Sequence, residues 1–242
     1  MNLAELTMAE FEAGLARTRT AIVPFGSVEE HGLHLPLGTD TFQIVEVARR
    51  AALEVPVFVA PPLHYGYCRS TRDHPGTLSL SPETVRRVAF DVGESLYRHG
   101  VRGLILASGH AGGLHMSALE EAGERLVEAF AESEVAVVCE YRWAQEEGLA
   151  GVVETGDDGH AGEIETSRIL ALDRALVKGT SPEEYPRLPR PFVARHKRPC
   201  WPGGVWGDPG KATPEKGEVL FTRCVARMVA LVREMEARIA PA

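Results

Sequence analysis

The feature that most constrains the fold is a fourfold alternation of short apolar runs with longer segments of helical periodicity. The apolar runs lie at residues 20–25, 57–60, 101–107 and 135–139. Short apolar runs bounded by turn residues are typical of strands buried on both faces, and strands that alternate with helices form a parallel sheet. The sequence therefore predicts an α/β protein, a three-layer α/β/α architecture with a mostly parallel sheet, as a single domain over residues 1–242.

Polar residues stand where several helices should begin. Thr7 opens a capping box, and Ser81 and Thr213 each precede a proline, which is favoured in the first helical turn. The helix after Thr213 is expected to run to about residue 239. Either Thr39 or Asp40 is positioned to cap a helix that extends to about residue 53.

Three of the predicted loops carry side chains that packing does not explain. They are residues 26–40 after the first strand, 108–113 after the third and 157–166 after the fourth. In a parallel sheet these loops emerge at the same edge, which is where open α/β sheets place their chemistry. Their polar side chains are therefore expected to converge although they lie far apart in the chain.

The first loop contains the residue types of a metal site. Glu29 and His31 are two positions apart in an extended segment, so both point to the same side. Asp40 has two carboxylate oxygens and is able to bridge two divalent cations, in competition with its capping role. His34 is expected either to ligate or to orient a ligand from behind. We therefore predict that this loop supplies half of a two-metal site.

The other two loops complete the predicted site. His110 lies in a glycine-rich turn that lacks the lysine and the spacing of a phosphate-binding loop, so a metal ligand is favoured over a phosphate cradle. Glu165 is expected in the first or second turn of a helix, either as a ligand or as a charge that the helix dipole favours, whereas Glu163 points elsewhere. His160 is predicted to carry protons beside the metals, since its pKa lies near neutrality.

Composition excludes several classes of function. The chain has 242 residues and a formal net charge of −8, whereas nucleic acids and anionic membranes need a basic face. No apolar stretch approaches the roughly 20 residues that cross a bilayer, and the N-terminus does not resemble a signal peptide. Four scattered cysteines without zinc spacing fit reduced thiols, so we expect a cytoplasmic protein without nucleic-acid or membrane partners.

Residues 180–213 are rich in proline and glycine and show little periodicity. A long irregular segment inside a compact domain is often a lid over a site or a contact between subunits. The sequence leaves both alternatives open.

Several motifs together resemble the creatininase (creatinine amidohydrolase) family. The resemblance begins with residues 26–40, GSVEEHGLHLPLGTD, and continues with PGTLSL at 75–80 and Gly-His at 109–110. It extends through HAGEIETS at 160–167 to a late GVWGDP…AT block at 204–213. The first and the HAGEIETS motifs are the most specific, and the matches together span about residues 20–217.

The resemblance implies a hydrolase of C–N bonds in amides, often cyclic or formyl amides, with a dinuclear centre of zinc, manganese or iron, zinc being preferred. It implies Glu29, Asp40 and His110 on one metal, and His31, Asp40 and Glu165 on the other. It further implies His160 as the acid/base, a small-molecule amide as substrate, and a homo-oligomer, commonly a hexamer.

This chain departs from the family pattern at two places. Ser108 replaces the usual Asn before Gly-His, and Gly112 and Gly113 stand where creatininases carry a Glu-Asn pair. The missing carboxylate weighs against creatinine as the substrate. The alternatives are a creatininase-like peptidase of peptide-cofactor maturation and a non-catalytic metal-binding protein of the same fold, although the intact ligand set with His160 argues against the latter.

Overall fold

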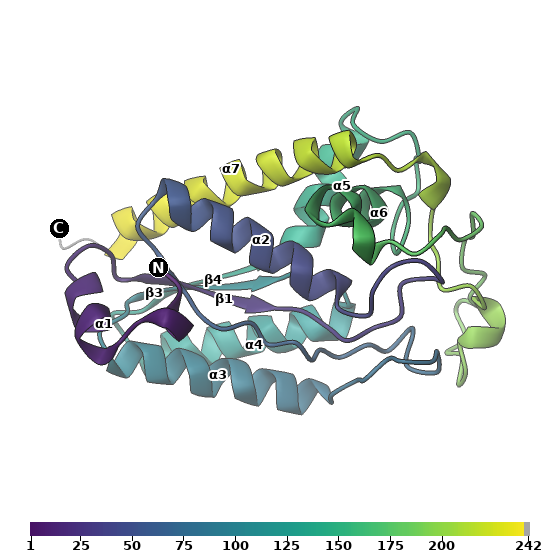
Figure 1. Cartoon of the computed structure of the whole chain (residues 1–242). Coiled ribbons are helices and arrows are strands. Elements are labelled where there is room, and N and C mark those ends of the chain that lie inside the picture. The colour runs from purple at the N-terminus through teal and green to yellow at the C-terminus, as the bar shows by residue number, and fades with distance from the viewer. Residues whose placement is uncertain (240–242) are drawn as a thin grey trace.

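A computed structural model describes residues 1–239 of the chain (Figure 1). Over these residues four strands and seven α-helices alternate along most of the sequence, and four short 3-10 helices accompany them. In chain order the strands and α-helices are α1 (Met8–Gly14), β1 (Thr20–Phe25), α2 (Thr39–Glu54), β2 (Phe58–Val59), α3 (Pro82–Arg98), β3 (Gly103–Ser108), α4 (Gly113–Ala129), β4 (Glu134–Cys139), α5 (Glu140–Leu149), α6 (Glu163–Leu172) and α7 (Pro214–Ile239).

The four strands form one parallel sheet in the order β2-β1-β3-β4. All six residues of β1 and all six of β3 are buried, as expected for central strands covered on both faces. The register pairs Phe25 with Ser108 and Ser108 with Cys139, so β1, β3 and β4 end side by side. We call this the carboxyl edge of the sheet.

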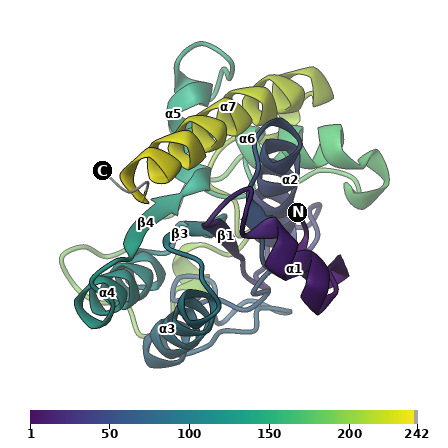
Figure 2. The same cartoon turned by 90° about the vertical axis from the view of Figure 1, so that its left-hand side faces the viewer.

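Helices cover both faces of the sheet. Figures 1 and 2 show α3 and α4 on one face, and α2, α5, α6 and α7 on the other. The long helix α7 packs on α2, α5 and α6 and reaches the sheet, where its buried Met235 side chain lies against Gly103 of β3. The predicted α/β class and three-layer arrangement with a parallel sheet are confirmed.

The local signals explain most of the boundaries. Thr7 forms the predicted capping box with Glu10 at the start of α1, and the Ser81 side chain accepts a hydrogen bond from the Thr84 amide at the start of α3. α3 ends before Gly100, whose φ of 100° is accessible to glycine without strain. The last helix begins at Pro214, as predicted, and continues to the last described residue, Ile239.

Three local predictions were wrong. The N-cap of α2 is Gly38, so Asp40 lies inside the first turn, where its side chain is not used for capping. The second strand is only two residues long, Phe58–Val59. Helix α5 was not predicted, because it begins at Glu140 directly after β4 with no capping side chain. The third polar loop therefore follows α5 and not β4.

Residues 180–213, which we call the covering segment, lack regular structure apart from two 3-10 helices, Arg198–Cys200 and Pro209–Lys211. Glu184 ties the segment to itself by accepting hydrogen bonds from the amides of Gly203 and Val205. Within residues 1–239, no helix combines the length and the apolar character needed to cross a bilayer.

Candidate metal centre

The residues that were predicted to form a site come together at the carboxyl edge of the sheet. The loop after β1 and the first turn of α2 approach the turn after β3, and the segment before α6 closes the group. All of the predicted residues are buried except His160, which is partly buried. They are Glu29, His31, Asp40, His110, His160 and Glu165.

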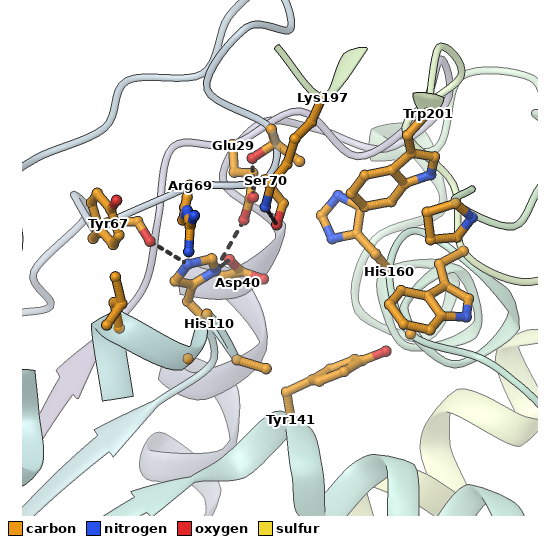
Figure 3. Close-up of a pocket in the computed structure, with 18 of the residues that line it drawn as sticks. Glu29, Asp40, Tyr67, Arg69, Ser70, His110, Tyr141, His160, Lys197 and Trp201 are labelled. Carbon is orange, nitrogen blue, oxygen red and sulfur yellow. Dashed lines mark hydrogen bonds and ion pairs between the residues drawn. The ribbon is translucent and has the colours of Figure 1, made fainter. Parts of the chain in front are cut away.

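Asp40 lies at the middle of this cluster. Its Oδ1 atom is 3.2 Å from Nε2 of His31, and its Oδ2 atom is 3.0 Å from Nδ1 of His110. The Ser27 hydroxyl donates to Oδ2 at 2.6 Å and holds the carboxylate in place. Figure 3 shows Asp40 below Glu29 and against the ring of His110. One carboxylate therefore reaches two imidazoles, one from the loop after β1 and one from the turn after β3.

A second carboxylate stands beside each imidazole. Oε2 of Glu29 is 2.9 Å from Nδ1 of His110, and Oε1 of Glu165 is 3.6 Å from Nε2 of His31. Beside Asp40, ligand-type atoms within 4.8 Å of one another form two groups, one of Glu29, Cys68 and His110 and the other of His31, His160 and Glu165. The geometry thus offers two adjacent positions for a cation, with Asp40 between them.

Backbone carbonyls fix which ring nitrogen faces the carboxylates. Nδ1 of His31 donates to the carbonyl of Glu29 at 3.0 Å, and Nε2 of His110 donates to the carbonyl of Tyr67 at 3.0 Å. A carbonyl only accepts, so these nitrogens keep their hydrogens and the opposite nitrogens point at Asp40. This is the arrangement in which metal-ligating histidines are usually held.

The outer carboxylates are also held by hydrogen bonds. The Thr71 hydroxyl donates to Oε1 of Glu29, and Gln43 donates to Oε1 of Glu165 at 3.3 Å. The amide of Ala161 donates to Oε2 of Glu165 at 2.6 Å. Ala161 has a φ of 50°, in the left-handed region that a non-glycine residue seldom occupies.

The charges of the cluster shift the pKa values of its members. Burial alone raises the pKa of Glu29, but the charge and the hydrogen bond of His110 outweigh it and lower that pKa to about 2. Burial also opposes the shift of Asp40, whose pKa is nevertheless held well below its usual range by His31 and His110. Against the effect of burial, the neighbouring carboxylates raise the pKa of His31 and of His110 well above 6.5. The cluster attracts positive charge, whether protons or cations.

Gly109 allows the turn after β3 to reach Asp40. A Cβ atom at this position would lie 2.2 Å from the carbonyl oxygen of Asp40, well inside van der Waals contact. The glycine therefore lets His110 approach the first turn of α2 closely enough to share the Asp40 carboxylate.

His160 approaches from the other side of the cluster. Its Nε2 donates to the carbonyl of Glu30 at 2.8 Å, and its ring lies 4.2 Å, centroid to centroid, from the ring of His31. Trp201 of the covering segment packs edge-on against the ring of His160, with the ring centroids 5.3 Å apart. Trp201 is itself anchored, since its carbonyl accepts from Nε2 of His74 at 2.8 Å.

A cavity of about 440 Å³ opens over the cluster, a size that suits a small ligand. Figure 3 shows Glu29, Asp40 and His110 on one side of this cavity, with His160 and Trp201 across it. The covering segment lines the cavity with Pro186, Leu188, Lys197, Trp201 and Trp206. This segment therefore covers the site, as the first of the two alternatives predicted, and the subunit contact stays a prediction.

Two neighbouring residues take no direct part in the cluster. Both ring nitrogens of His34 are engaged, Nδ1 with the Ser181 hydroxyl at 2.9 Å and Nε2 with the Thr166 hydroxyl at 2.8 Å. Burial, with the charge of His31, lowers the pKa of His34 to about 4, so it is neutral. Glu163 points away from the site and pairs with Lys216 at 2.6 Å.

Sequence reasoning missed two residues of the site. The hydroxyl of Tyr141 lines the cavity, is buried and has no hydrogen-bond partner among residues 1–239. The thiol of Cys68 lies beside Glu29 and His110, and burial raises its pKa to about 12, so it is neutral. Neither residue belongs to a recognisable motif. A tyrosine directly after a core strand was the one available signal for Tyr141.

Comparison with known proteins gives consistent relatives. The family model of creatininase, described as creatinine amidohydrolase, matches residues 4–232. Creatinine amidohydrolase of Pseudomonas putida is 29% identical over 250 residues, which cover 95% of each chain. The mycofactocin precursor peptide peptidase of Mycobacterium ulcerans is 31% identical over 229 residues, covering 86% of this chain and 83% of the relative.

Solved structures agree with the sequence relatives. A manganese form of creatininase superposes with a TM-score of 0.88 at 25% identity, covering 97% of this chain and 98% of that one. A zinc–zinc form of a creatininase variant superposes with a TM-score of 0.85 at 26% identity, again covering 97% and 98%.

Proposed function

Since this chain belongs to the creatininase family, we propose that it is a metal-dependent amidohydrolase that cleaves a C–N amide bond in a small molecule. The observation that carries the proposal is the position of Asp40, whose two oxygens lie 3.2 Å and 3.0 Å from the imidazoles of His31 and His110. A buried carboxylate shared between two imidazole–carboxylate pairs is suited to bridging two divalent cations.

The donor set fits two cations. Glu29, Asp40 and His110 would hold one, and His31, Asp40 and Glu165 the other. Nε2 of His31 is buried and has no hydrogen-bond partner within the described residues, although it faces the carboxylates of Asp40 and Glu165. Such an atom carries a desolvation cost that coordination removes. Divalent cations held here would polarise the amide carbonyl and lower the pKa of a bound water.

We assign the proton transfer to His160. Its Nε2 donates to the carbonyl of Glu30 and keeps its hydrogen, so Nδ1 is the atom that gains or loses a proton. Burial and the charge of His31 lower the pKa of His160, but Glu30 and Glu29 outweigh them and raise it. The imidazolium is therefore populated near neutrality and can protonate the amide nitrogen as it leaves.

Tyr141 is placed to bind the substrate. Burial, followed by the charges of Glu165 and Asp158, raises the pKa of its hydroxyl well above 10. The hydroxyl therefore remains a neutral donor, and its missing partner is supplied by an oxygen of the substrate.

We propose an amide other than creatinine. Gly112 stands where creatininases carry a carboxylate, and a Cβ there would lie 2.5 Å from Nε2 of His110. The local backbone thus leaves no room for a longer side chain unless His110 moves. A second candidate is hydrolysis of a peptide bond in the maturation of a peptide cofactor, which the 31% identity to a mycofactocin precursor peptide peptidase favours.

The test combines metal analysis with a substrate panel. We expect the purified protein to contain zinc, manganese or iron, and to hydrolyse at least one of a formamidopyrimidine, a cyclic ureide and a short peptide in preference to creatinine. Chelation should abolish turnover and reloading should restore it. Full turnover by protein without metal would overturn the proposal.

A pair of variants tests the role of His160. We expect His160→Gln to retain its metal and to lose roughly 10²- to 10⁴-fold in turnover, the usual contribution of a positioned acid or base. His99→Gln, at the exposed end of α3, should retain both the metal and the turnover of the wild type. Loss of metal from His160→Gln would instead identify His160 as a ligand.

The remaining assignments stay predictions. These are the number and identity of the metals, the hexameric assembly, the cytoplasmic location and the organisation of residues 1–242 as one domain. All four cysteines are free thiols, which agrees with a reducing compartment.

A further inference from the structure

Two cationic side chains face the cavity over the metal centre. Arg69, from the loop between β2 and α3, and Lys197, from the covering segment, both line it. Figure 3 shows them on the same side of the cavity as Glu29 and His110, across from His160 and Trp201. Two segments distant in sequence therefore bring positive charge to one wall of a cavity.

Neither cation has an acidic partner. Over residues 1–239, no carboxylate lies within 4.0 Å of Arg69 or Lys197, whereas the adjacent Arg72 is 3.8 Å from the carboxylate of Asp73. Within the described residues the ammonium of Lys197 donates only to the Ser70 hydroxyl, at 3.0 Å. In a chain with a net charge of −8, two cationic side chains that line a cavity without acidic partners are unusual.

The surroundings increase the positive potential. Burial, and then the charges of Arg69, Arg72 and Arg190, lower the pKa of Lys197. The charges of these three arginines therefore all act on the ammonium of Lys197. An anion bound between Arg69 and Lys197 would relieve that repulsion and accept charge-assisted hydrogen bonds.

We propose that the substrate of this enzyme carries an anionic group, a carboxylate or a phosphate, held by Arg69 and Lys197 while its amide lies at the metal centre. This inference rests on the proposed function, because the metal centre defines where the amide lies. Trp201 and Trp206 of the covering segment also line the cavity, so an apolar or planar part of this substrate would pack against aromatic rings.

Hydroxamates test the proposal without knowledge of the natural substrate, since a hydroxamate binds the metals and its other end probes the cations. The probes are succinic monohydroxamic acid, its carboxamide isostere and 3-phosphonopropionohydroxamic acid, with the zinc-loaded protein. We expect at least one anionic probe to bind about tenfold more tightly than the carboxamide. The stronger of the two anions identifies the natural group as carboxylate or phosphate.

Variants locate the effect. In Arg69→Gln/Lys197→Gln the preference for the anionic probe should disappear, while the affinity for the carboxamide stays unchanged. Arg87→Gln removes an exposed charge of α3 that does not line the cavity and should preserve the preference. If the double variant does not fold, the salt dependence of the wild type decides, because added NaCl should weaken only the anionic probes.

The outcomes separate this inference from the proposed function. Equal binding of the anionic and neutral hydroxamates would overturn the inference and leave the metal centre intact. Binding of no hydroxamate, together with absence of metal, would overturn the proposed function and the inference with it. A preference that survives in the double variant would also overturn the assignment to Arg69 and Lys197.

Discussion

Buried carboxylates occur in two regions of this molecule, and their partners differ. Beneath α7, Glu140 and Arg168 are fully buried and form an ion pair at 2.5 Å, with the guanidinium 4.6 Å from the ring centroid of Phe221. At the carboxyl edge of the sheet, Glu29, Asp40 and Glu165 are also buried. In the described part of the chain, no lysine or arginine lies within 4.0 Å of these three.

The difference separates charges that stabilise the fold from charges that are suited to binding a ligand. Glu140 is neutralised by a guanidinium of the same chain, which is permanently charged. Among residues 1–239 the only cationic partners of the three carboxylates of the metal centre are imidazoles, which balance the carboxylates as long as the imidazoles are protonated. Divalent cations provide the same balance with the imidazoles neutral. The comparison therefore predicts opposite consequences. Removing a carboxylate of the metal centre should cost activity but not the fold, whereas removing the partner of Glu140 should cost stability but not the metal.

The largest expected effect comes from Asp40→Ala. Losing the carboxylate shared by both cation positions should remove the metals and lower turnover by at least about 10⁴-fold, a part of the 10⁶-fold or greater acceleration typical of enzymes. The metal-free protein should stay folded, because one of three mutually repelling charges is gone. Metal analysis, kinetics and thermal unfolding measure this. Asp157→Ala, which removes an exposed acid of a neighbouring loop, is the control.

The next effect is expected from Arg168→Met. It leaves Glu140 buried without its cation, which typically costs about 3–5 kcal/mol in the free energy of unfolding. The ligands of the metal centre are untouched, so the metal content per folded molecule should not change. Denaturant unfolding of the metal-loaded protein measures the loss, and Arg168→Met/Glu140→Leu should recover much of it. Unchanged stability in the single variant would contradict the comparison.

The sequence predicted the metal centre better than its surroundings, for a physical reason. Glu29, His31 and His110 directly follow core strands, where packing favours neither charge nor imidazole, so their residue types alone point to chemistry. The parallel sheet then brings them to one edge. Tyr141 and Cys68 are ordinary residues of a core, and only the structure shows that their polar atoms face the cavity and the carboxylates.

The sequence also failed to predict helix boundaries that no capping side chain marks. Helix α5 starts directly at Glu140, and α2 starts at Thr39, after an N-cap, Gly38, that has no side chain to cap it. The covering segment has no periodicity at all, because its position is fixed by tertiary contacts such as that of His74 with the carbonyl of Trp201. Such contacts join positions more than a hundred residues apart and leave no pattern in the sequence.

The third prediction concerns the pH dependence of metal affinity. The raised pKa values of His31 and His110 mean that both imidazoles hold protons near neutrality in the metal-free protein, and a cation must displace them. Affinity should therefore rise with pH, by about tenfold per unit for each proton released. Competition titrations between pH 6 and 8, chosen as roughly the range in which imidazoles titrate, measure the slope. An affinity independent of pH would contradict the assignment of these imidazoles as ligands.

The smallest expected effect on stability concerns a partly buried ion pair, that of Glu163 with Lys216. Glu163 pairs with Lys216 but also accepts hydrogen bonds from the amides of Glu154 and Thr155, so Lys216→Met leaves it partly satisfied and should cost only about 1 kcal/mol. Burial raises the pKa of Glu163, yet Lys216 and Thr155 outweigh it and lower that pKa. The stabilisation by Lys216 is therefore present above the unfolded-state pKa of about 4.5.

That stabilisation should be lost as the pH falls through the lower pKa of the folded state, because protonated Glu163 no longer attracts Lys216. The unfolding free energies of the wild type and Lys216→Met should thus differ at pH 7 and converge in acid. Arg238→Met, which removes an exposed pair with Glu234, should change stability by less than about 0.5 kcal/mol at either pH. A difference at Lys216 that persists in acid would show that its packing, and not its charge, stabilises this edge of the fold.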